Sequence, residues 1–193
     1  ETDLAARFKM LHDDDGLYVL VDVTDSVVEV HRDNPGEWND DSIEIFVDWL
    51  NEGRDHDDLS GQITFNAVDN DVYNHAKTPI DFTNFERASV ITDGVGYVVE
   101  IFIPASAWGV NMANVSEIGF DIHVNDMDVT NPDATWAPAR RLWSDRAGDN
   151  FNTTSGFGTV LLAEDSNIWY GFSIESDYFV DTGSWMGYVW IGD

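Results

Sequence analysis

Residues 36–49 read GEWNDDSIEIFVDW, and this stretch decides which kind of fold the chain can adopt. From residue 42 to residue 47 the side chains alternate, with Ile43, Ile45 and Val47 on one face and Ser42, Glu44 and Phe46 on the other. A period of two predicts a β-strand with two unlike faces. We expect the first face to join a hydrophobic core and the second to present Glu44 beside an exposed aromatic ring.

Trp38 lies just upstream of this strand, in a loop that Gly36 and Asn39 keep irregular. An aromatic plane beside a fixed carboxylate suits a sugar, because the C–H face of a pyranose stacks on rings while its hydroxyls donate to acceptors. The alternative is that Trp38 packs inside the protein and Glu44 is a solvated strand residue, since Trp side chains are usually largely buried.

Short apolar runs separated by turn residues continue along the rest of the chain. They predict strands over residues 7–11, 16–24, 42–50, 62–68, 88–92, 96–103, 118–124, 135–143 and 158–163. Residues 69–87 are polar and contain Pro79, which predicts a long excursion of the kind that often serves a function. Strands this short and regularly spaced predict an all-β fold, an antiparallel β-sandwich of the immunoglobulin-like or jelly-roll-like type.

The composition changes after Glu164, where aromatic residues become dense. At 193 residues the chain is long enough for one well-buried domain and an appendage. We therefore expect residues 1–163 to form the β-sandwich and residues 164–193 to form an added aromatic C-terminal hairpin around residues 181–184. Because an isolated hairpin is marginal in water, we expect it to pack on the same chain rather than on a partner.

The charge is strongly negative, with 37 acidic against 9 basic residues and a formal net charge of −28. Such a field repels nucleic acid and anionic membranes, so neither is an expected partner. The acid excess suits solubility in a salty medium, cation binding, or both. The chain has no cysteine, which excludes disulfides, thiolate metal sites and a cysteine nucleophile. No apolar run approaches the roughly 20 residues that span a bilayer, and any signal peptide is expected to lie outside this sequence.

Several stretches of the chain together resemble the family 9 carbohydrate-binding modules that are appended to xylanases and other secreted polysaccharide-degrading enzymes. In chain order they are LYVLVDVTD (17–25), DSIEIFVD (41–48), GYVVEIFIP (96–104), IGFDIHVND (118–126), WSD (143–145) and FG (157–158). The order and spacing match over roughly residues 6–163, and the aromatic tail lies outside the resemblance. The resemblance implies a β-sandwich that binds the ends of glucan or xylan chains, without catalysis, between two aromatic rings and with structural calcium.

The resemblance also assigns sugar-binding roles to residues of this chain. Trp38 stands where the family has its first sandwiching Trp, Glu44 matches its sugar-binding Glu, and Gln62 matches a neighbouring Gln. The family's other Trp position is held by Phe151, whose smaller ring weakens stacking, and Asp149 and Asn150 lie in the loop that supplies polar contacts. Thr64 replaces an Arg whose charged fork would bond two hydroxyls at once. His123 and Asn125 on the matching central strand are candidate replacements, so a different sugar and a degenerate site both stay open.

The acidic loops predict calcium, which takes six to eight oxygen ligands from carboxylates and carbonyls. The family carries acids near two places of this chain, and the candidate ligands there are Asp48, Asn51, Asp57 and Asp58. A second candidate is the segment 69–71, DND. The alternative is a solvated acidic loop, because no stretch fits the regular twelve-residue calcium loop.

The functional prediction is a secreted, non-catalytic bacterial module that brings a covalently linked glycoside hydrolase or surface protein to plant or algal polysaccharide. The acidity of the chain suits a marine or saline environment. The alternative is a structural or adhesive surface module with a degenerate sugar site. Glu44 with Asp121 or Asp126 resembles a glycosidase pair, but carboxylate pairs arise by chance in so acidic a chain. Haem held by His123 and a methionine, Met10 or Met127, is a further alternative.

Overall fold

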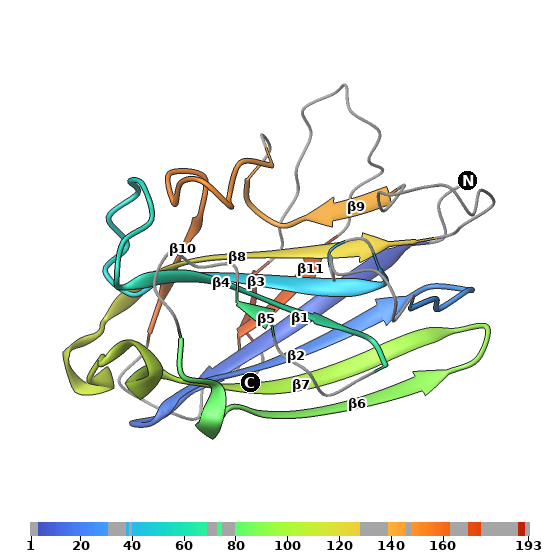
Figure 1. Cartoon of the computed structure of the whole chain (residues 1–193), viewed down its shortest axis with the longest axis horizontal. Helices are drawn as coiled ribbons and strands as arrows, with labels where there is room; N and C mark the ends of the chain where they lie inside the picture. The colour runs from blue at the N-terminus through green and yellow to red at the C-terminus, as the bar shows by residue number, and fades with distance from the viewer. Residues whose placement is uncertain are drawn as a thin grey trace.

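The computed structural model describes residues 4–30, 38, 40–68, 73–74, 80–127, 139–145, 148–162, 170–174 and 189–191. In these residues the chain forms two antiparallel β-sheets that pack face to face (Figure 1). The predicted all-β sandwich is thereby confirmed. The helices of this part of the chain are short 3₁₀ turns, none of them long or apolar enough to cross a bilayer.

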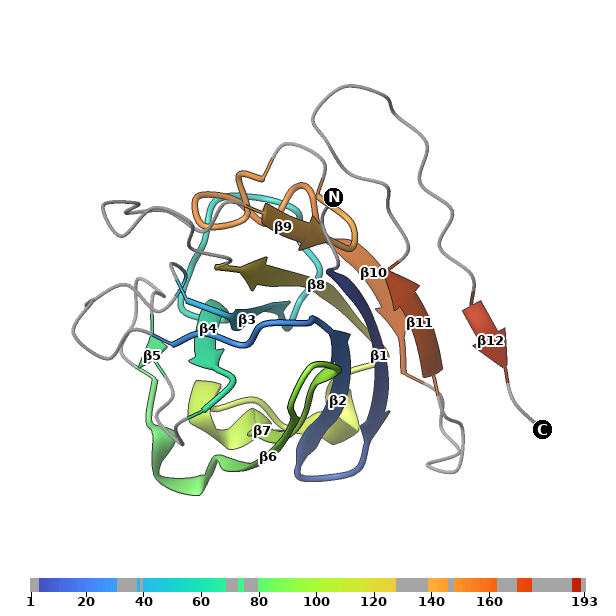
Figure 2. The ribbon, with the colours of Figure 1, turned by 90° about the vertical axis from the view of Figure 1, so that its right-hand side faces the viewer.

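The first sheet contains six strands in the order β12, β11, β1, β2, β7 and β6. Their bounds, in the same order, are Val189–Ile191, Tyr170–Ile174, Ala5–His12, Gly16–Thr24, Gly96–Pro104 and Glu86–Thr92. Of β11 and β12 only the backbone pairing is described, and β11 pairs with β1, so the C-terminal segment continues the first sheet (Figure 2). The division of the chain at residue 163 stays a prediction, and the turn predicted at residues 181–184 lies outside the described residues.

The second sheet has the order β10, β8, β3, β4 and β5, and β9 pairs with the other end of β8. The bounds are Gly158–Leu161, Glu117–Asp126, Ser42–Asp48, Ser60–Asn66 and Tyr73–Asn74, with β9 at Ala139–Leu142. Three 3₁₀ turns complete the described elements: η2 (Phe82–Asn84), η3 (Ala105–Trp108) and η4 (Met112–Asn114). The predicted excursion contains β5 and η2, and its segment 69–71 lies outside the described residues.

The hydrophobic core lies between the sheets and is built from alternate residues of each strand. Phe8 and Met10 of β1 and Val19 and Val21 of β2 contribute from the first sheet. The predicted inner face of β3 contributes from the second, with Ile43, Ile45 and Val47 fully buried. Each such side chain contributes about 1.5–3 kcal/mol on burial, so the alternation read from the sequence fixes which face of each strand turns inward.

Two glycines let β2 and β7 pair closely along their whole length. A Cβ on Gly16 would lie 2.2 Å from the carbonyl oxygen of Ile103, and one on Gly96 would lie 2.0 Å from that of Val23. Gly96 also has a φ of 135°, which residues with a side chain rarely adopt. The close pairing of β2 with β7 therefore depends on these two positions.

The outer face of β3 differs from the prediction that it is exposed. Glu44 is only 4% exposed and Phe46 only 1%. The ring of Phe46 lies 4.5 Å from that of His123 and 5.8 Å from that of Phe157, measured between centroids. The segment between β9 and β10 thus covers this face, and β3 is buried on both sides.

Candidate functional site

Antiparallel register lines up polar residues of three strands on the outer face of the second sheet. Glu44 of β3 lies opposite Thr64 of β4 and His123 of β8. The neighbouring rows join Ser42 with Asn66 and Asn125, and Phe46 with Gln62 and Asp121. Because residues opposite each other share a face, the structure brings together five of the predicted sugar-binding residues: Glu44, Gln62, Thr64, His123 and Asn125.

The Glu44 carboxylate is held in one position by two amide groups. Gln62 Nε2 donates to Oε2 at 2.5 Å, and Asn125 Nδ2 donates to Oε1 at 2.9 Å. Asn125 is itself positioned by the Ser42 hydroxyl at 3.0 Å. Hydrogen bonds to an ionised acceptor are stronger than neutral ones, so the carboxylate is oriented before any ligand arrives.

A loop between β9 and β10 is anchored to the same face through Asn150. Its Nδ2 lies 2.6 Å from Asp121 Oδ2 and 3.0 Å from His123 Nε2. Its carbonyl oxygen lies 2.6 Å from Nε2 of His56, whose other ring nitrogen contacts Ser60. These contacts fix the backbone on either side of Asn150, where Asp149 and Phe151 stand.

The two predicted aromatic walls come from separate loops. Trp38 is half-buried and precedes β3 by four residues, so its ring is not sealed in the core. Phe151 is 58% exposed and follows the anchored Asn150 directly. Asp149 is exposed and accepts a hydrogen bond from Asn152, which shapes the turn. The facing of the two rings across a slot stays a prediction.

The face retains unused hydrogen-bonding capacity. The Thr64 hydroxyl and the Asn150 Oδ1 atom are buried and have no hydrogen-bond partner among the described residues. Buried polar groups are nearly always paired, and an unpaired one costs about 1–3 kcal/mol. Both atoms therefore mark where a polar ligand or water would complete the network.

Asp121 is a structural hub of this face, although from the sequence it stands out only as a chance partner of Glu44 in a glycosidase pair. Its carboxylate accepts hydrogen bonds from the backbone N–H groups of Ile122, Ser144 and Asp145, besides Asn150. Burial raises its pKa to about 6, although these bonds act in the opposite direction. The sequence feature that could have indicated this role is the WSD stretch at 143–145, because its backbone N–H groups donate to Asp121. A carboxylate so fully engaged is a poor acid or nucleophile.

The pairing of His123 with Met10 lacks the geometry of a haem site, and haem held by His123 and Met127 stays a prediction. Met10 packs in the core between the sheets, whereas His123 lies on the outer face of β8. The two side chains are therefore on opposite sides of the second sheet.

A cluster of three buried aspartates joins the ends of three strands. Asp25 follows β2, Asp41 precedes β3 and Asp126 ends β8, and one carboxylate oxygen of each lies within 4.8 Å of the others. Asp41 accepts hydrogen bonds from the backbone N–H groups of Glu29 and Met127. Burial first, and then the charges of Asp25 and Asp126, raise the pKa of Asp41 to about 8, although these hydrogen bonds act in the opposite direction. Such a cluster is favourable in ionised form only with a cation.

The donor set around this cluster fits a hard cation. Tyr97 is buried, its hydroxyl has no hydrogen-bond partner among the described residues, and the three carboxylate charges act on it. Burial first, and then these charges, raise the pKa of Tyr97 well above its usual value. Calcium prefers such oxygen donors. Sequence reasoning missed the cluster, although each aspartate ends or adjoins one of the stretches that carry the family resemblance.

The metal ligands predicted from sequence are engaged in other contacts. The Asp48 carboxylate accepts from the N–H groups of Leu50, Glu52 and Gly53 and from the Thr154 hydroxyl. The Asn51 amide donates to Glu117 and Thr159, and Asp57 accepts from the Leu59 N–H and from Arg54. Within the described residues the group that satisfies the metal geometry is the aspartate cluster. Metal binding at Asp48, Asn51, Asp57 and Asp58 stays a prediction.

Comparison with known proteins gives one consistent result. The model of the family described as "Carbohydrate family 9 binding domain-like" matches residues 1–165. The exoglucanase XynX of Acetivibrio thermocellus is 38% identical over 158 residues, which are 81% of this chain and 13% of that protein. Endo-1,4-beta-xylanase A of Thermoanaerobacterium saccharolyticum gives the same identity and coverage. The chain thus spans 13% of the length of these relatives.

Two solved structures share the fold. Both are of a family 9 carbohydrate-binding module from Caldicellulosiruptor kristjanssonii, one in complex with glucose and one with cellotriose. The glucose complex has a TM-score of 0.72 and 26% identity, and the match covers 86% of this chain and 81% of that one. The cellotriose complex has a TM-score of 0.70 and 25% identity, with 86% and 84% covered.

Proposed function

The chain belongs to the family of carbohydrate family 9 binding domains, and we propose that it binds the ends of xylan or glucan chains in an aromatic slot on the outer face of the second sheet. Members of this family bind without catalysis. The observation that carries the proposal is the buried Glu44 carboxylate, which Gln62 and Asn125 hold ready on the face to which the Asn150 loop is anchored.

A terminal sugar ring would fit this site through two kinds of contact. Trp38 and Phe151 stack on its C–H faces, each worth on the order of 1 kcal/mol beyond the buried area. Its hydroxyls donate to Glu44 and complete the bonding of Thr64 Oγ1 and Asn150 Oδ1. A ring that reaches the buried Glu44 must enter between covering loops, which favours a chain end over a chain interior. The expected affinity is micromolar to millimolar, about 4–8 kcal/mol.

The biological role we propose is targeting. The curated relatives are large bacterial xylanases and an exoglucanase in which the matched part is 13–14% of the chain. As one domain of a secreted enzyme, the module would hold a linked glycoside hydrolase against plant or algal polysaccharide. Weak binding suffices for this purpose, because tethering raises the effective concentration of the enzyme at the polymer.

Calcium at Asp25, Asp41 and Asp126 would stabilise the module. The cluster connects β2 of the first sheet with β3 and β8 of the second. A divalent cation offsets the repulsion of three buried carboxylates. Because Asp41 follows Trp38 by three residues, the ion would also restrain the segment that carries the first aromatic wall.

Calorimetric titration with glucose, cellotriose and xylotriose tests the slot. Trp38→Ala and Phe151→Ala are each expected to weaken binding roughly fivefold or more. Leu161→Ala is the matched control, because Leu161 is an exposed apolar residue of β10 at 63% exposure. Unchanged binding in both ring variants would refute the slot. A folded protein that binds none of these sugars would favour the structural or adhesive alternative.

A further inference from the structure

The outer face of the first sheet carries an ordered set of exposed side chains that the sugar slot does not use. Register places Leu11, Tyr18, Phe102 and Glu86 in one row across β1, β2, β7 and β6. The next row contains Lys9, Leu20, Glu100 and Ala88. Two aromatic residues thus lie side by side on the central strands β2 and β7, near the β1–β2 turn, flanked by an aliphatic residue and a carboxylate.

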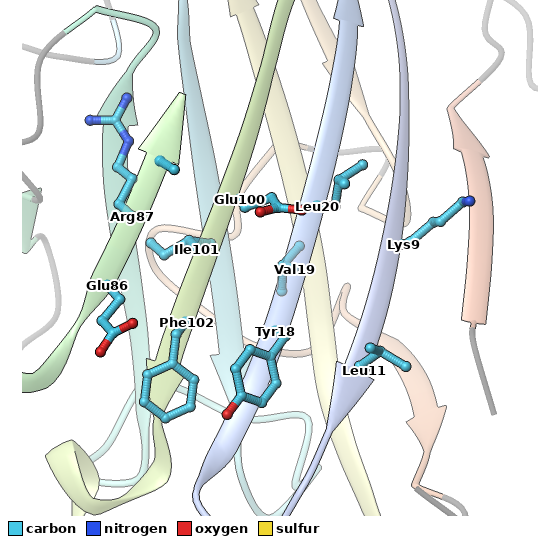
Figure 3. A pocket seen from close by; sticks show the side chains of 11 residues that line it. Lys9, Leu11, Tyr18, Val19, Leu20, Glu86, Arg87, Glu100, Ile101 and Phe102 are labelled. Atoms are coloured by element: carbon cyan, nitrogen blue, oxygen red, sulfur yellow. The ribbon is translucent and has the colours of Figure 1, made fainter. Parts of the chain in front are cut away.

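These rows line a hollow on the sheet. Its volume is about 370 Å³, and its walls include Tyr18, Phe102, Leu20, Glu86 and Glu100. In Figure 3 the two rings lie next to each other at the lower end of the hollow, with Glu100 and Leu20 above them. A second hollow of about 420 Å³ shares Tyr18, Phe102 and Glu86 with the first and adds Asp14 and Asp15. The two hollows meet at these rings and run along the strands toward the β1–β2 turn.

The aromatic pair is rigid. The ring centroids of Tyr18 and Phe102 are 4.7 Å apart with planes inclined by 29°. The Tyr18 hydroxyl donates to Asp13 at 2.8 Å, and Asp13 also caps the β1–β2 turn through the N–H groups of Asp15 and Gly16. Tyr18 is nevertheless 39% exposed. The chain therefore holds a pair of neighbouring aromatic rings that solvent reaches, and the flat faces of such rings suit stacking against the C–H faces of sugars.

The charges on the outer face of the first sheet indicate which class of partner can bind there. Four carboxylates, those of Asp14, Asp15, Glu86 and Glu100, lie along the two hollows together with the Lys9 ammonium, whereas the Arg87 side chain turns inward over the Phe65 ring. With a net charge of −28 the protein repels a second copy of itself as well as anionic polymers and membranes. A neutral polysaccharide meets no such repulsion, offers C–H faces to the rings and donates hydroxyl protons to the carboxylates.

We propose that this face, the Tyr18–Phe102 surface, is a second carbohydrate-binding site that takes an internal stretch of a neutral polysaccharide chain. It lies on the opposite side of the sandwich from Glu44. A path that passes over the rings from one hollow to the other suits linked sugar units, whereas the covered face at Glu44 suits a single terminal ring. Together the two sites would let one module hold a chain end and a neighbouring chain interior.

The test separates the two sites by variant and by ligand. Trp38→Ala with Phe151→Ala disables the slot, and binding to soluble neutral xylan and mixed-linkage glucan is then followed by affinity electrophoresis and calorimetry. Tyr18→Leu with Phe102→Leu, added to that background, removes the flat rings while keeping apolar bulk for folding. Val98→Ala, on the same strand and face as Phe102, is the matched control.

We expect the slot-disabled protein to retain polymer binding and the two leucine changes to weaken it roughly tenfold, with the control unchanged. Isotope-labelled protein titrated with xylohexaose should show amide shifts at Leu11 and Ala88. Loss of all polymer binding with the slot, polymer binding that ignores the leucine changes, or dimerisation that depends on Tyr18 and Phe102 would each overturn the proposal. Binding of cellotriose to the unaltered protein reports on the slot alone, so a failure of either site is distinguishable from a failure of the other.

Discussion

The outer faces of the two sheets start from the same alternation and reach opposite states. On the second sheet, Glu44 and its polar neighbours are covered by the loop of Asn150 and hydrogen-bond to one another. On the first sheet, Tyr18, Glu86 and Glu100 remain exposed over an open hollow. A polar face that is covered becomes a preorganised network, because each buried polar group must find a partner. An uncovered face can keep aromatic rings and carboxylates in contact with solvent, which suits the less selective binding that we propose for the Tyr18–Phe102 surface.

Chelation should act on the covered face more than on the open one. Removing calcium is expected to lower the free energy of unfolding by about 4 kcal/mol if the free ion exceeds its dissociation constant a thousandfold, or about 10 °C in Tm. Calorimetry with EDTA and with added calcium measures this. Binding of cellotriose should fall with the metal, because Asp41 adjoins the segment of Trp38, whereas polymer binding at the Tyr18–Phe102 surface should persist.

Two variants distinguish the aspartate cluster from the metal site predicted from sequence. Asp41→Asn should abolish the response of Tm to calcium, and Asp57→Asn should leave it intact. The reverse pattern would place the ion in the loop after β3, among the ligands predicted from sequence.

Glu44 on the covered face and Glu100 on the open face allow the two faces to be compared at single residues. Both side chains point outward from central strands. Glu44→Ala leaves the amide groups of Gln62 and Asn125 buried without their acceptor, which should lower the free energy of unfolding by about 3 kcal/mol and abolish binding in the slot. Glu100→Ala removes an exposed side chain and should change stability by less than about 0.5 kcal/mol. Urea denaturation of both variants checks this, and equal effects would mean that the Glu44 network is not a structural unit.

Local patterns in the sequence were sufficient for the fold of the sandwich. The alternation at Ile43, Ile45 and Val47 correctly predicts the inner face of β3, and the resemblance to family 9 modules is confirmed by the family match. The coverage of the outer face could not be read in the same way. It depends on contacts such as Asn150 with Asp121 and Asn125 with Glu44, between residues that are 29 and 81 positions apart.

The candidate sites show the same difference between what local sequence patterns predict and what long-range packing decides. The sequence placed Glu44, Gln62, Thr64, His123 and Asn125 as sugar-binding candidates, and register gathers them on one face. The aspartate cluster was not predicted, because Asp25, Asp41 and Asp126 meet only once β2 is packed beside the ends of β3 and β8. Likewise, the Tyr18–Phe102 surface exists only through the pairing register of β2 with β7.

The pH dependence of stability should have opposite signs on the two faces. The pKa of Asp121 is raised by burial from 3.8 to about 6, so the folded state holds this proton more tightly than the unfolded state. Stability from this group is therefore present below about pH 4 and is lost as the pH rises to about 6, by on the order of 2–3 kcal/mol. Asp121→Asn should flatten this slope in thermal unfolding curves recorded with excess calcium.

Asp13, in the β1–β2 turn of the first sheet, has a pKa shifted in the opposite direction to that of Asp121. Burial alone would raise its pKa, but hydrogen bonds from the Asp15 N–H, the Tyr18 hydroxyl and the Gly16 N–H together lower it. The stability that Asp13 contributes to the folded state is thus present above the usual pKa of an aspartate and is lost as the pH falls. Asp13→Asn should remove stability at neutral pH and leave the slope due to Asp121 unchanged, and a common effect of both variants on that slope would contradict the assignment.

The smallest expected effect concerns the ring that separates this chain from its family pattern. Phe151→Trp replaces the smaller ring at the second wall of the slot, and at 58% exposure the site has room for the larger side chain. A wider plane covers more of a pyranose face, so affinity for cellotriose should rise about three- to tenfold, with stability nearly unchanged. The corresponding change in the open hollow, Phe102→Trp, should leave cellotriose binding as it is, because a free trisaccharide is expected to enter the slot. If Phe151→Trp has no effect on any sugar while Trp38→Ala does, the second wall is formed by another residue and the slot has one aromatic side.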